Sequence, residues 1–216
     1  MSLLYDTWMY FVEHGAEVWQ YILQQLYLVA IPVCVAIIVA IPVTILATRV
    51  KHLYPLIMGF SNGVQTIPSM ALLVLMITIG LGIGMLPAVI ALFVYALMPI
   101  VRNTYVGIKG VPEEVKDAAI GMGTTKWQLL VMVELPLAIK VIIAGVRSAL
   151  VSTIGFATLA ALIGAGGLGA LILQGLGMAD NAIVLAGTIP AVVMAFLAEF
   201  IMGRLEHWLT PRGLRD

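Results

Sequence analysis

Two long stretches without a charged side chain constrain the fold of this chain most strongly. No Asp, Glu, Lys or Arg occurs between Glu17 and Arg49, and none occurs between Lys51 and Arg102. A helix needs about 20 mainly apolar residues to cross the roughly 30 Å hydrocarbon core of a bilayer. The first stretch therefore accommodates one membrane span and the second accommodates two. The composition agrees with this, because only 10% of the residues are charged, against roughly a quarter in soluble domains.

We predict an all-α integral membrane fold with about five transmembrane helices. The glycine-rich segment 80–84, followed by Pro87, divides the second charge-free stretch, because glycine and proline interrupt regular structure. The apolar piece 168–176 is too short to cross the membrane and is expected to form a loop or half-helix. The predicted spans are 21–48, 56–79, 85–106, 137 to about 163, and 182–202.

The distribution of charge predicts the orientation of these spans. With the N-terminus outside and the C-terminus in the cytoplasm, every Lys and Arg lies on the cytoplasmic side or in the inner half of a span. The acidic residues Asp6, Glu13, Glu17 and Asp180 lie outside. This arrangement obeys the positive-inside rule, and the opposite orientation violates it throughout. No basic segment precedes the first span, so we expect it to remain in the mature protein instead of acting as a cleaved signal.

These assignments divide the chain into three segments. Residues 1–18 are predicted to be an extracytoplasmic N-terminal segment, residues 19–203 a membrane domain, and residues 204–216 a cytoplasmic tail. Within the membrane domain, residues 111–136 form one large polar loop on the predicted cytoplasmic side. A membrane protein that keeps so little outside the bilayer is expected to use such a loop to contact a soluble partner.

The polar loop is predicted to contain two helices joined at a glycine. Pro112 suits the first turn of a helix, where its missing N–H would have no partner. Gly123 suits the left-handed conformation that ends many helices. Thr125 and Gln128 have the spacing of a capping box, which begins a second helix expected to end near Pro136. These features alone favour an amphipathic linker on the membrane surface equally well.

The loop resembles the EAA motif of ABC importer permeases, Glu-Ala-Ala-x3-Gly-x9-Ile-x-Leu-Pro. Both gaps are preserved here, and Asp and Val replace the Glu and Ile of the pattern. The matching residues are Asp117, Ala118, Ala119, Gly123, Val133, Leu135 and Pro136. The resemblance implies that the loop couples the permease to an ATPase, with Trp127 adding an aromatic anchor.

Three further segments resemble the permeases of osmoprotectant importers, which carry glycine betaine, carnitine, choline or proline betaine. They are Gln-Thr-Ile-Pro-Ser at 65–69, Leu-Met-Pro-Ile-Val-Arg-Asn-Thr-Tyr at 97–105, and Ala-Ala-Leu-Ile-Gly-Ala-Gly-Gly-Leu-Gly at 160–169. The methionine-importer permeases look like more distant relatives. The resemblance covers about residues 19–200 and implies a type I ABC importer permease in a bacterial inner (cytoplasmic) membrane.

The resemblance also implies the partners. These are two copies of a cytoplasmic ABC ATPase, a second permease subunit that is identical or homologous, and an extracytoplasmic binding lipoprotein or periplasmic protein. We expect that binding protein to be a separate polypeptide, because the sequence ends shortly after the last predicted span. The chain has no phosphate-binding loop, so we expect it to be no enzyme and to hold no cofactor, with ATP and Mg²⁺ on the partner. Its formal net charge of zero argues against a nucleic-acid partner.

Polar residues within the predicted spans are candidates for the transport path. Gln65, Ser69 and Asn103 are candidate lining residues. Arg147 is the deepest intramembrane charge, and we predict that it is satisfied within the protein, with Glu199 as its candidate partner. Snorkelling of these charges toward the lipid headgroups is the simpler interpretation. No aromatic cluster that would form a cage for a quaternary ammonium is evident.

Two other functions stay open from the sequence alone. A self-contained channel or carrier would transport without any ATPase, and its cytoplasmic helices would only lie on the membrane. An ABC permease with a different cargo, such as an amino acid, fits the same motif. The segment 164–169 fits the dinucleotide pattern G-x-G-x-x-G, but no strand precedes it, so we interpret it as a tight outer loop.

Overall fold

The computed structural model describes residues 3–50 and 52–211, and every regular element in these two ranges is a helix. The α-helices are α1 (Leu3–Glu13), α2 (Gly15–Arg49), α3 (Leu53–Thr66), α4 (Ser69–Met76), α5 (Met85–Lys109), α6 (Glu113–Gly121), α7 (Lys126–Leu129), α8 (Leu135–Leu159), α9 (Leu168–Met178) and α10 (Asn181–Leu209). Two π-helical turns, Ile77–Leu81 and Leu130–Glu134, and a 3₁₀ turn, Ala160–Ile163, extend α4, α7 and α8. The last five residues of the predicted tail lie outside the described ranges.

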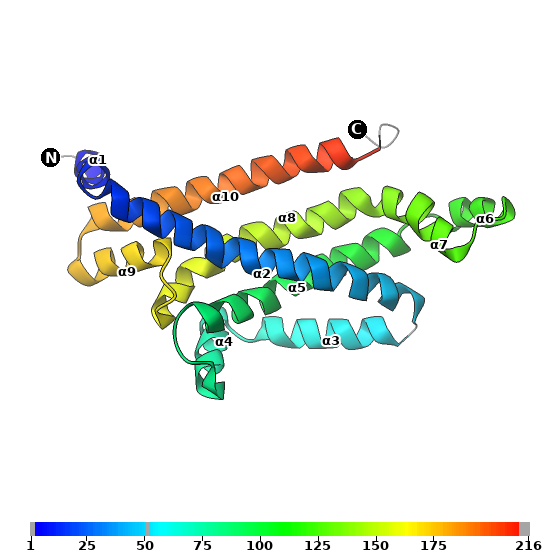
Figure 1. The fold of residues 1–216 in the computed structure, drawn as a ribbon, viewed down its shortest axis with the longest axis horizontal. Coiled ribbons are helices and arrows are strands. Elements are labelled where there is room, and N and C mark those ends of the chain that lie inside the picture. The colour runs from blue at the N-terminus through cyan, green and yellow to red at the C-terminus, as the bar shows by residue number, and fades with distance from the viewer. Residues whose placement is uncertain (1–2, 51, 212–216) are drawn as a thin grey trace.

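The long helices lie side by side along the length of the molecule (Figure 1). Helix α5 packs against both α2 and α8, and α10 packs against α8 and α9. Helices α6 and α7 project at one end, which we call the α6–α7 end, and α1 and α9 lie at the opposite, α1–α9 end (Figure 1). The main buried cluster joins side chains of α2, α4, α5 and α8. The α5–α8 pair is therefore the centre of the fold.

Small residues allow α5 and α8 to approach closely. A Cβ added at Gly145 of α8 would lie 2.6 Å from Cβ of Asn103 and 2.8 Å from the carbonyl oxygen of Pro99, both on α5. A Cβ added at Gly107 would lie 3.1 Å from the carbonyl oxygen of Ala138. Lipid tails are as apolar as the helices, so close contact at small residues is what favours helix association in a bilayer.

Four helices are long and apolar enough to cross a membrane, which confirms the first, third, fourth and fifth predicted spans. They are Gly15–Arg49, Met85–Lys109, Lys126–Ile163 and Asn181–Leu209. The second predicted span, 56–79, corresponds to a bent pair of helices, because Leu53–Val64 and Ser69–Leu81 meet at an angle of 95°; the pair is either one broken span or a re-entrant segment. Proline disfavours helical backbone in the residue before it, and Ile67, before Pro68, is extended at φ −77° and ψ 123°.

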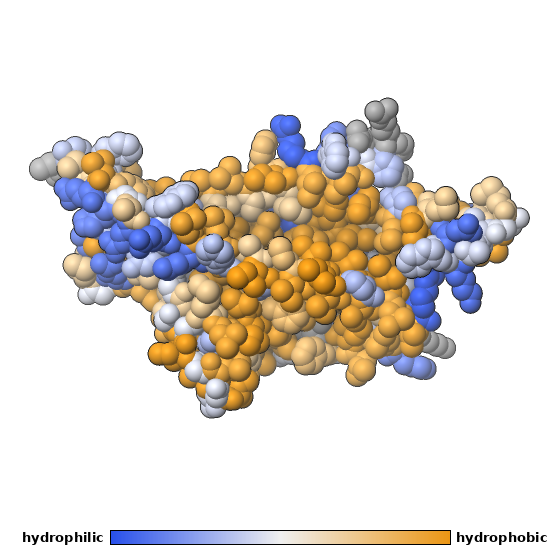
Figure 2. Space-filling model, viewed as in Figure 1, coloured by the Kyte–Doolittle hydropathy of each residue, from blue (hydrophilic) through white to orange (hydrophobic). Residues whose placement is uncertain are grey.

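The surface separates apolar from polar residues along the same axis. Figure 2 shows an apolar band across the middle of the molecule, with polar residues gathered at both ends. The acids Asp6, Glu13 and Asp180 line one cavity at the α1–α9 end. Basic residues at the opposite end include Arg49 and Lys116, which line a cavity beside α6. These basic residues and the acids Asp6, Glu13 and Asp180 therefore lie at opposite ends, and Glu113 and Glu134 line the cavity at the α6–α7 end as well.

The glycine-rich turn before α9 is held by two glutamines of α2. Gln25 is fully buried; its Nε2 donates to the carbonyl oxygen of Ile154 at 3.1 Å and its Oε1 accepts from Leu168 N at 3.1 Å. Oε1 of Gln24 accepts from Gly167 N at 2.9 Å. The turn is thereby fixed against α2 and α8. Helix α9 confirms the predicted half-helix, being a short apolar helix of 11 residues.

Candidate coupling surface and transport cavity

The turn between α6 and α7 has the geometry that the sequence predicts. Helix α6 begins after Pro112 and ends before Gly123, which adopts a left-handed φ of 86°. The backbone N and the Oγ1 of Thr124 both donate to the carbonyl oxygen of Ala119, at 3.3 and 2.8 Å. Thr125 and Gln128 form the reciprocal capping box, with N–H to side-chain oxygen distances of 2.8 and 3.3 Å. These bonds satisfy backbone groups that the helix ends would leave unpaired.

The second helix of the loop does not end near Pro136, so that prediction is wrong. Residues Lys126–Ile163 form one continuous helical segment, in which Leu130–Glu134 is a π turn. Leu135 N donates to the carbonyl oxygen of Leu130, five residues earlier. Pro136 is the second residue of α8 and directly follows this wider turn, where the regular helical hydrogen-bond pattern is already interrupted. Helix α7 therefore continues into a membrane-spanning helix without an intervening loop.

The α6–α7 tip, residues 113–129, presents an exposed apolar face. Ile120 is 55% exposed, Met122 is 80% exposed and Trp127 is 71% exposed. Asp117, Ala118 and Gly123 are also exposed, whereas Ala119 is buried against the turn. Exposed apolar side chains on a projecting polar element are typical of a protein-binding surface, and tryptophan is enriched among the residues that dominate such contacts.

A bidentate ion pair connects the base of this tip to α2. Nη1 and Nη2 of Arg49 face Oε1 and Oε2 of Glu134, and the Nη1–Oε1 distance is 3.3 Å. The side chain of Glu134 is 3% exposed and that of Arg49 is 42% exposed. Leu135 and Pro136 follow and are partly buried. We did not predict this pair from the sequence, although an acid within the otherwise apolar run 129–139 is a signal for a buried partner.

A polar cavity of about 720 Å³ lies on α5 and α8. It is lined by Tyr95, Met98, Pro99, Arg102, Asn103, Val106, Ser148, Ser152 and Phe156. Asn103, one of the three predicted lining residues, lies in this cavity, and its Nδ2 donates to the carbonyl oxygen of Pro99 at 2.8 Å. Ser69 begins α4, beyond the 95° bend, and the side chain of Gln65 lies outside the described part of the structure.

Arg147 is paired within the protein. Its Nε lies 3.5 Å from Oε1 of Glu199, and its Nη1 lies 3.2 Å from Oε2 of Glu206. The structure therefore brings together the two residues that the sequence suggested and adds a second acid from the same helix, α10. The arrangement ties α10 to α8.

The comparisons with known proteins agree with this geometry. Residues 33–211 match the family described as the binding-protein-dependent transport system inner membrane component. This chain belongs to that family. It is 44% identical over 207 residues to a carnitine transport permease protein of Listeria monocytogenes, covering 96% of this chain and 94% of the relative. It is 42% identical over 214 residues to an osmoprotectant import permease protein of Salmonella typhimurium, covering 97% and 100%.

A further relative has a name that lists several solutes. It is the glycine betaine/carnitine/choline transport system permease protein of Bacillus subtilis, 42% identical over 192 residues, with 89% of this chain and 88% of the relative covered. The fold resembles a chain of the methionine ABC transporter in an inward-facing conformation, with a TM-score of 0.79, 24% identity, and 90% and 94% coverage. This permease is therefore a multi-pass inner-membrane component of an ABC transporter, which works with an ATPase and a substrate-binding protein.

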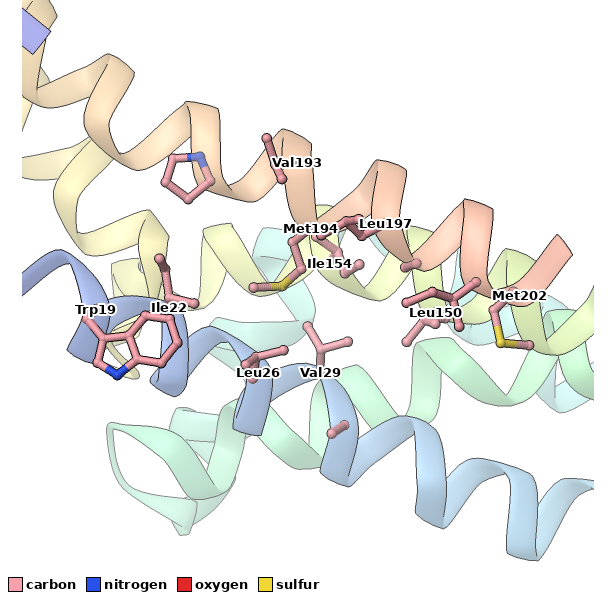
Figure 3. A pocket seen from close by; sticks show the side chains of 14 residues that line it. Trp19, Ile22, Leu26, Val29, Leu150, Ile154, Val193, Met194, Leu197 and Met202 are labelled. Atoms are coloured by element: carbon pink, nitrogen blue, oxygen red, sulfur yellow. The ribbon is translucent and has the colours of Figure 1, made fainter. Parts of the chain in front are cut away.

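The permease also carries an apolar groove of about 480 Å³ between α2, α8 and α10. Figure 3 shows Trp19, Val29, Met194 and Leu197 among the side chains around it. Every lining residue is apolar except for the indole nitrogen of Trp19. Binding sites for polar solutes need a few placed polar groups, and the α5–α8 cavity supplies them.

Proposed function

We propose that this chain is the transmembrane permease subunit of an ATP-driven importer for quaternary-ammonium osmoprotectants, such as glycine betaine, carnitine and choline. The observation that carries the proposal is 44% identity over 96% of the chain to a carnitine transport permease. Two further relatives, each 42% identical, are named for osmoprotectants or for glycine betaine, carnitine and choline. Three relatives with this cargo class support an osmoprotectant over an amino acid.

The α6–α7 tip is the element that contacts the ATPase. Its exposed apolar face of Ile120, Met122 and Trp127 fits a groove on a soluble partner, and Asp117 and Ala118 lie exposed beside it. The concentration of basic residues at this end favours a cytoplasmic location, with the N-terminus outside. Two ATPases, which hold the ATP and Mg²⁺, would each take one such tip. In this arrangement, ATP hydrolysis takes place on the ATPases, and the permease needs no catalytic residue or cofactor of its own.

The continuous helix from α7 into α8 explains how a displacement of the tip reaches the membrane. A movement of α7 passes through the π turn Leu130–Glu134 into α8, which forms one wall of the polar cavity. The Arg49–Glu134 pair carries the same movement to α2. Closure of the ATPases on ATP would thereby shift the cavity walls and change the side to which the path opens.

The polar cavity is half of the transport path. Arg102, Ser148 and Ser152 are exposed on helices that cross the membrane. Polar groups at this depth require water or protein around them, so a second permease subunit, identical or homologous, would cover this face. The extracytoplasmic binding protein would deliver cargo at the α1–α9 end. Glycine-rich turns and the Gln25 hydrogen bonds shape that entrance.

Uptake by the assembled importer tests this function. The permease, its ATPase and its binding protein would be expressed in a bacterial strain that lacks osmoprotectant uptake, and entry of labelled glycine betaine, carnitine and choline would be measured. We expect ATP-dependent uptake of at least one of them. The matched control carries an ATPase whose phosphate-loop lysine is replaced by alanine, which should abolish uptake. Uptake that persists in this control would support a self-contained carrier, and uptake of amino acids alone would refute the proposed cargo.

A further inference from the structure

The polar cavity on α5 and α8 has two chemically different ends. Tyr95 and Phe156 form an aromatic pair, with ring centroids 5.0 Å apart and planes inclined by 33°. Arg102 lies seven residues after Tyr95 on α5, which corresponds to roughly 10 Å of helix rise. Ser148 and Ser152 of α8 are exposed in the same cavity. The cavity thus has aromatic faces and a guanidinium, with hydroxyl groups also in its lining.

Arg102 contributes a positive charge to the lining of the polar cavity. It is exposed on a membrane-spanning helix, and it forms no ion pair with any residue in the ranges 3–50 and 52–211. Arg147, on the facing helix, is paired with Glu199 and Glu206 instead. An unpaired guanidinium within a span is a candidate for binding an anionic group of a ligand, because it can form two parallel hydrogen bonds to a carboxylate.

The aromatic end is held in place and is suited to a cation. The hydroxyl of Tyr95 donates to the carbonyl oxygen of Ile67 at 2.6 Å, so the phenol points toward the bend between α3 and α4. This bond fixes the ring beside Phe156. Aromatic faces attract quaternary ammonium groups within roughly 6 Å of the ring centroid. No local sequence pattern predicts this pair, because sixty residues separate Tyr95 from Phe156.

We propose that this cavity is a binding site within the permease for zwitterions that carry a quaternary ammonium at one end and a carboxylate at the other. The inference rests on the proposed osmoprotectant function and adds a site at which residues of the transport path recognise the transported solute. Arg102 binds the carboxylate, and Phe156 with Tyr95 binds the ammonium. A hydrogen bond of about 2.8 Å at one end and a cation–ring distance of up to about 6 Å at the other leave room for a short carbon chain. The open, partly polar lining allows release, as transport requires.

Direct binding to the assembled importer, without its binding protein, tests the site. The complex would be placed in lipid nanodiscs, and dissociation constants would be measured for glycine betaine, choline and glycine. Choline lacks the carboxylate, and glycine has a primary ammonium in place of the quaternary one, so each compound changes one end of the ligand. We expect glycine betaine to bind most tightly. The variants are Arg102→Gln, Arg102→Lys and Phe156→Leu, with Arg204→Gln and Phe196→Leu on α10 as matched controls.

The variants should affect binding of the two ends of the ligand independently. Arg102→Gln should weaken glycine betaine binding about tenfold, the value of a charge-assisted hydrogen bond, and leave choline within about twofold. Arg102→Lys should fall between, since it keeps the charge and loses the fork geometry. Phe156→Leu should weaken glycine betaine and choline alike, by about fivefold. Choline binding in the same Arg102→Gln sample shows that the cavity is intact.

Two kinds of result would refute the site. They are an absence of glycine betaine binding to the wild-type complex, and an equal loss of glycine betaine and choline binding in the Arg102 variants, complete loss of both included. Either of these can occur while the uptake experiment succeeds, and the permease would then keep its proposed function without a site in the path. If the wild-type importer takes up none of the three osmoprotectants, the proposed function itself fails.

Discussion

Removal of Arg49 should destabilise the permease by leaving Glu134 buried without its partner. Breaking a buried ion pair costs about 3–5 kcal/mol, whereas an exposed pair contributes about 0–1 kcal/mol. The carboxylate that remains in Arg49→Met is 3% exposed, but the arginine it loses is 42% exposed and its charge is partly screened by water. We therefore expect an intermediate loss of about 2–3 kcal/mol in the free energy of unfolding.

A double-mutant cycle measures this value. Unfolding of the purified permease in mixed detergent micelles would be followed by tryptophan fluorescence for the wild type, Arg49→Met, Glu134→Leu and the double variant. The double variant removes both charges, so it should be more stable than Arg49→Met alone, with an interaction energy of about 2 kcal/mol. Arg204→Met, an exposed arginine on α10 that stacks on Phe200, is the control and should change stability little. Additive losses in the cycle would refute the reasoning, because the pair would then contribute nothing.

Three further substitutions test other contacts. Gly145→Leu should push α5 away from α8, because the added Cβ would lie 2.6 Å from Cβ of Asn103. We expect the free energy of unfolding to fall by about 1–3 kcal/mol, measured as a lower thermal aggregation temperature. Unchanged stability would contradict the close packing of these helices. Gly123 has a left-handed φ of 86°, which valine adopts only with strain and asparagine adopts readily. Gly123→Val should therefore weaken ATPase binding, and Gly123→Asn should preserve it. Equal affinities of the two variants would show that the conformation of this turn does not matter for binding. Gln25→Leu should cost about 1–3 kcal/mol by leaving Leu168 N unpaired, and a neutral result would refute that.

The sequence predicts the parts of the fold that depend on local chemistry. The charge-free stretches locate the spans, and the capping box at Thr125 and Gln128 forms as its spacing requires. Gly123 takes the left-handed conformation that only residues without a bulky side chain adopt easily. In each case the residues that determine the structure lie close together in the sequence, so the local sequence pattern is enough to predict it.

The helix break at Pro68 and the long-range contacts could not be predicted from local sequence patterns, because they depend on tertiary packing. Pro32 and Pro42 lie inside the continuous helix α2, yet Pro68 ends α3. At Pro68 the extended backbone is supported by a tertiary contact, the hydrogen bond from the Tyr95 hydroxyl to Ile67, which no local pattern encodes. Arg49 and Glu134 are likewise 85 residues apart and meet only once α2 and α8 have packed.

The central claim is that the α6–α7 tip binds an ATPase. The most direct measurement is a mild pull-down of the permease from native membranes, with its partners identified by mass spectrometry. We predict that an ATPase with a phosphate-binding loop is recovered with the wild type and with Trp8→Ala, an exposed tryptophan at the opposite end, and is lost with Trp127→Ala combined with Gly123→Val. Recovery of the permease alone, or equal recovery of the ATPase with the tip variant, would contradict the account.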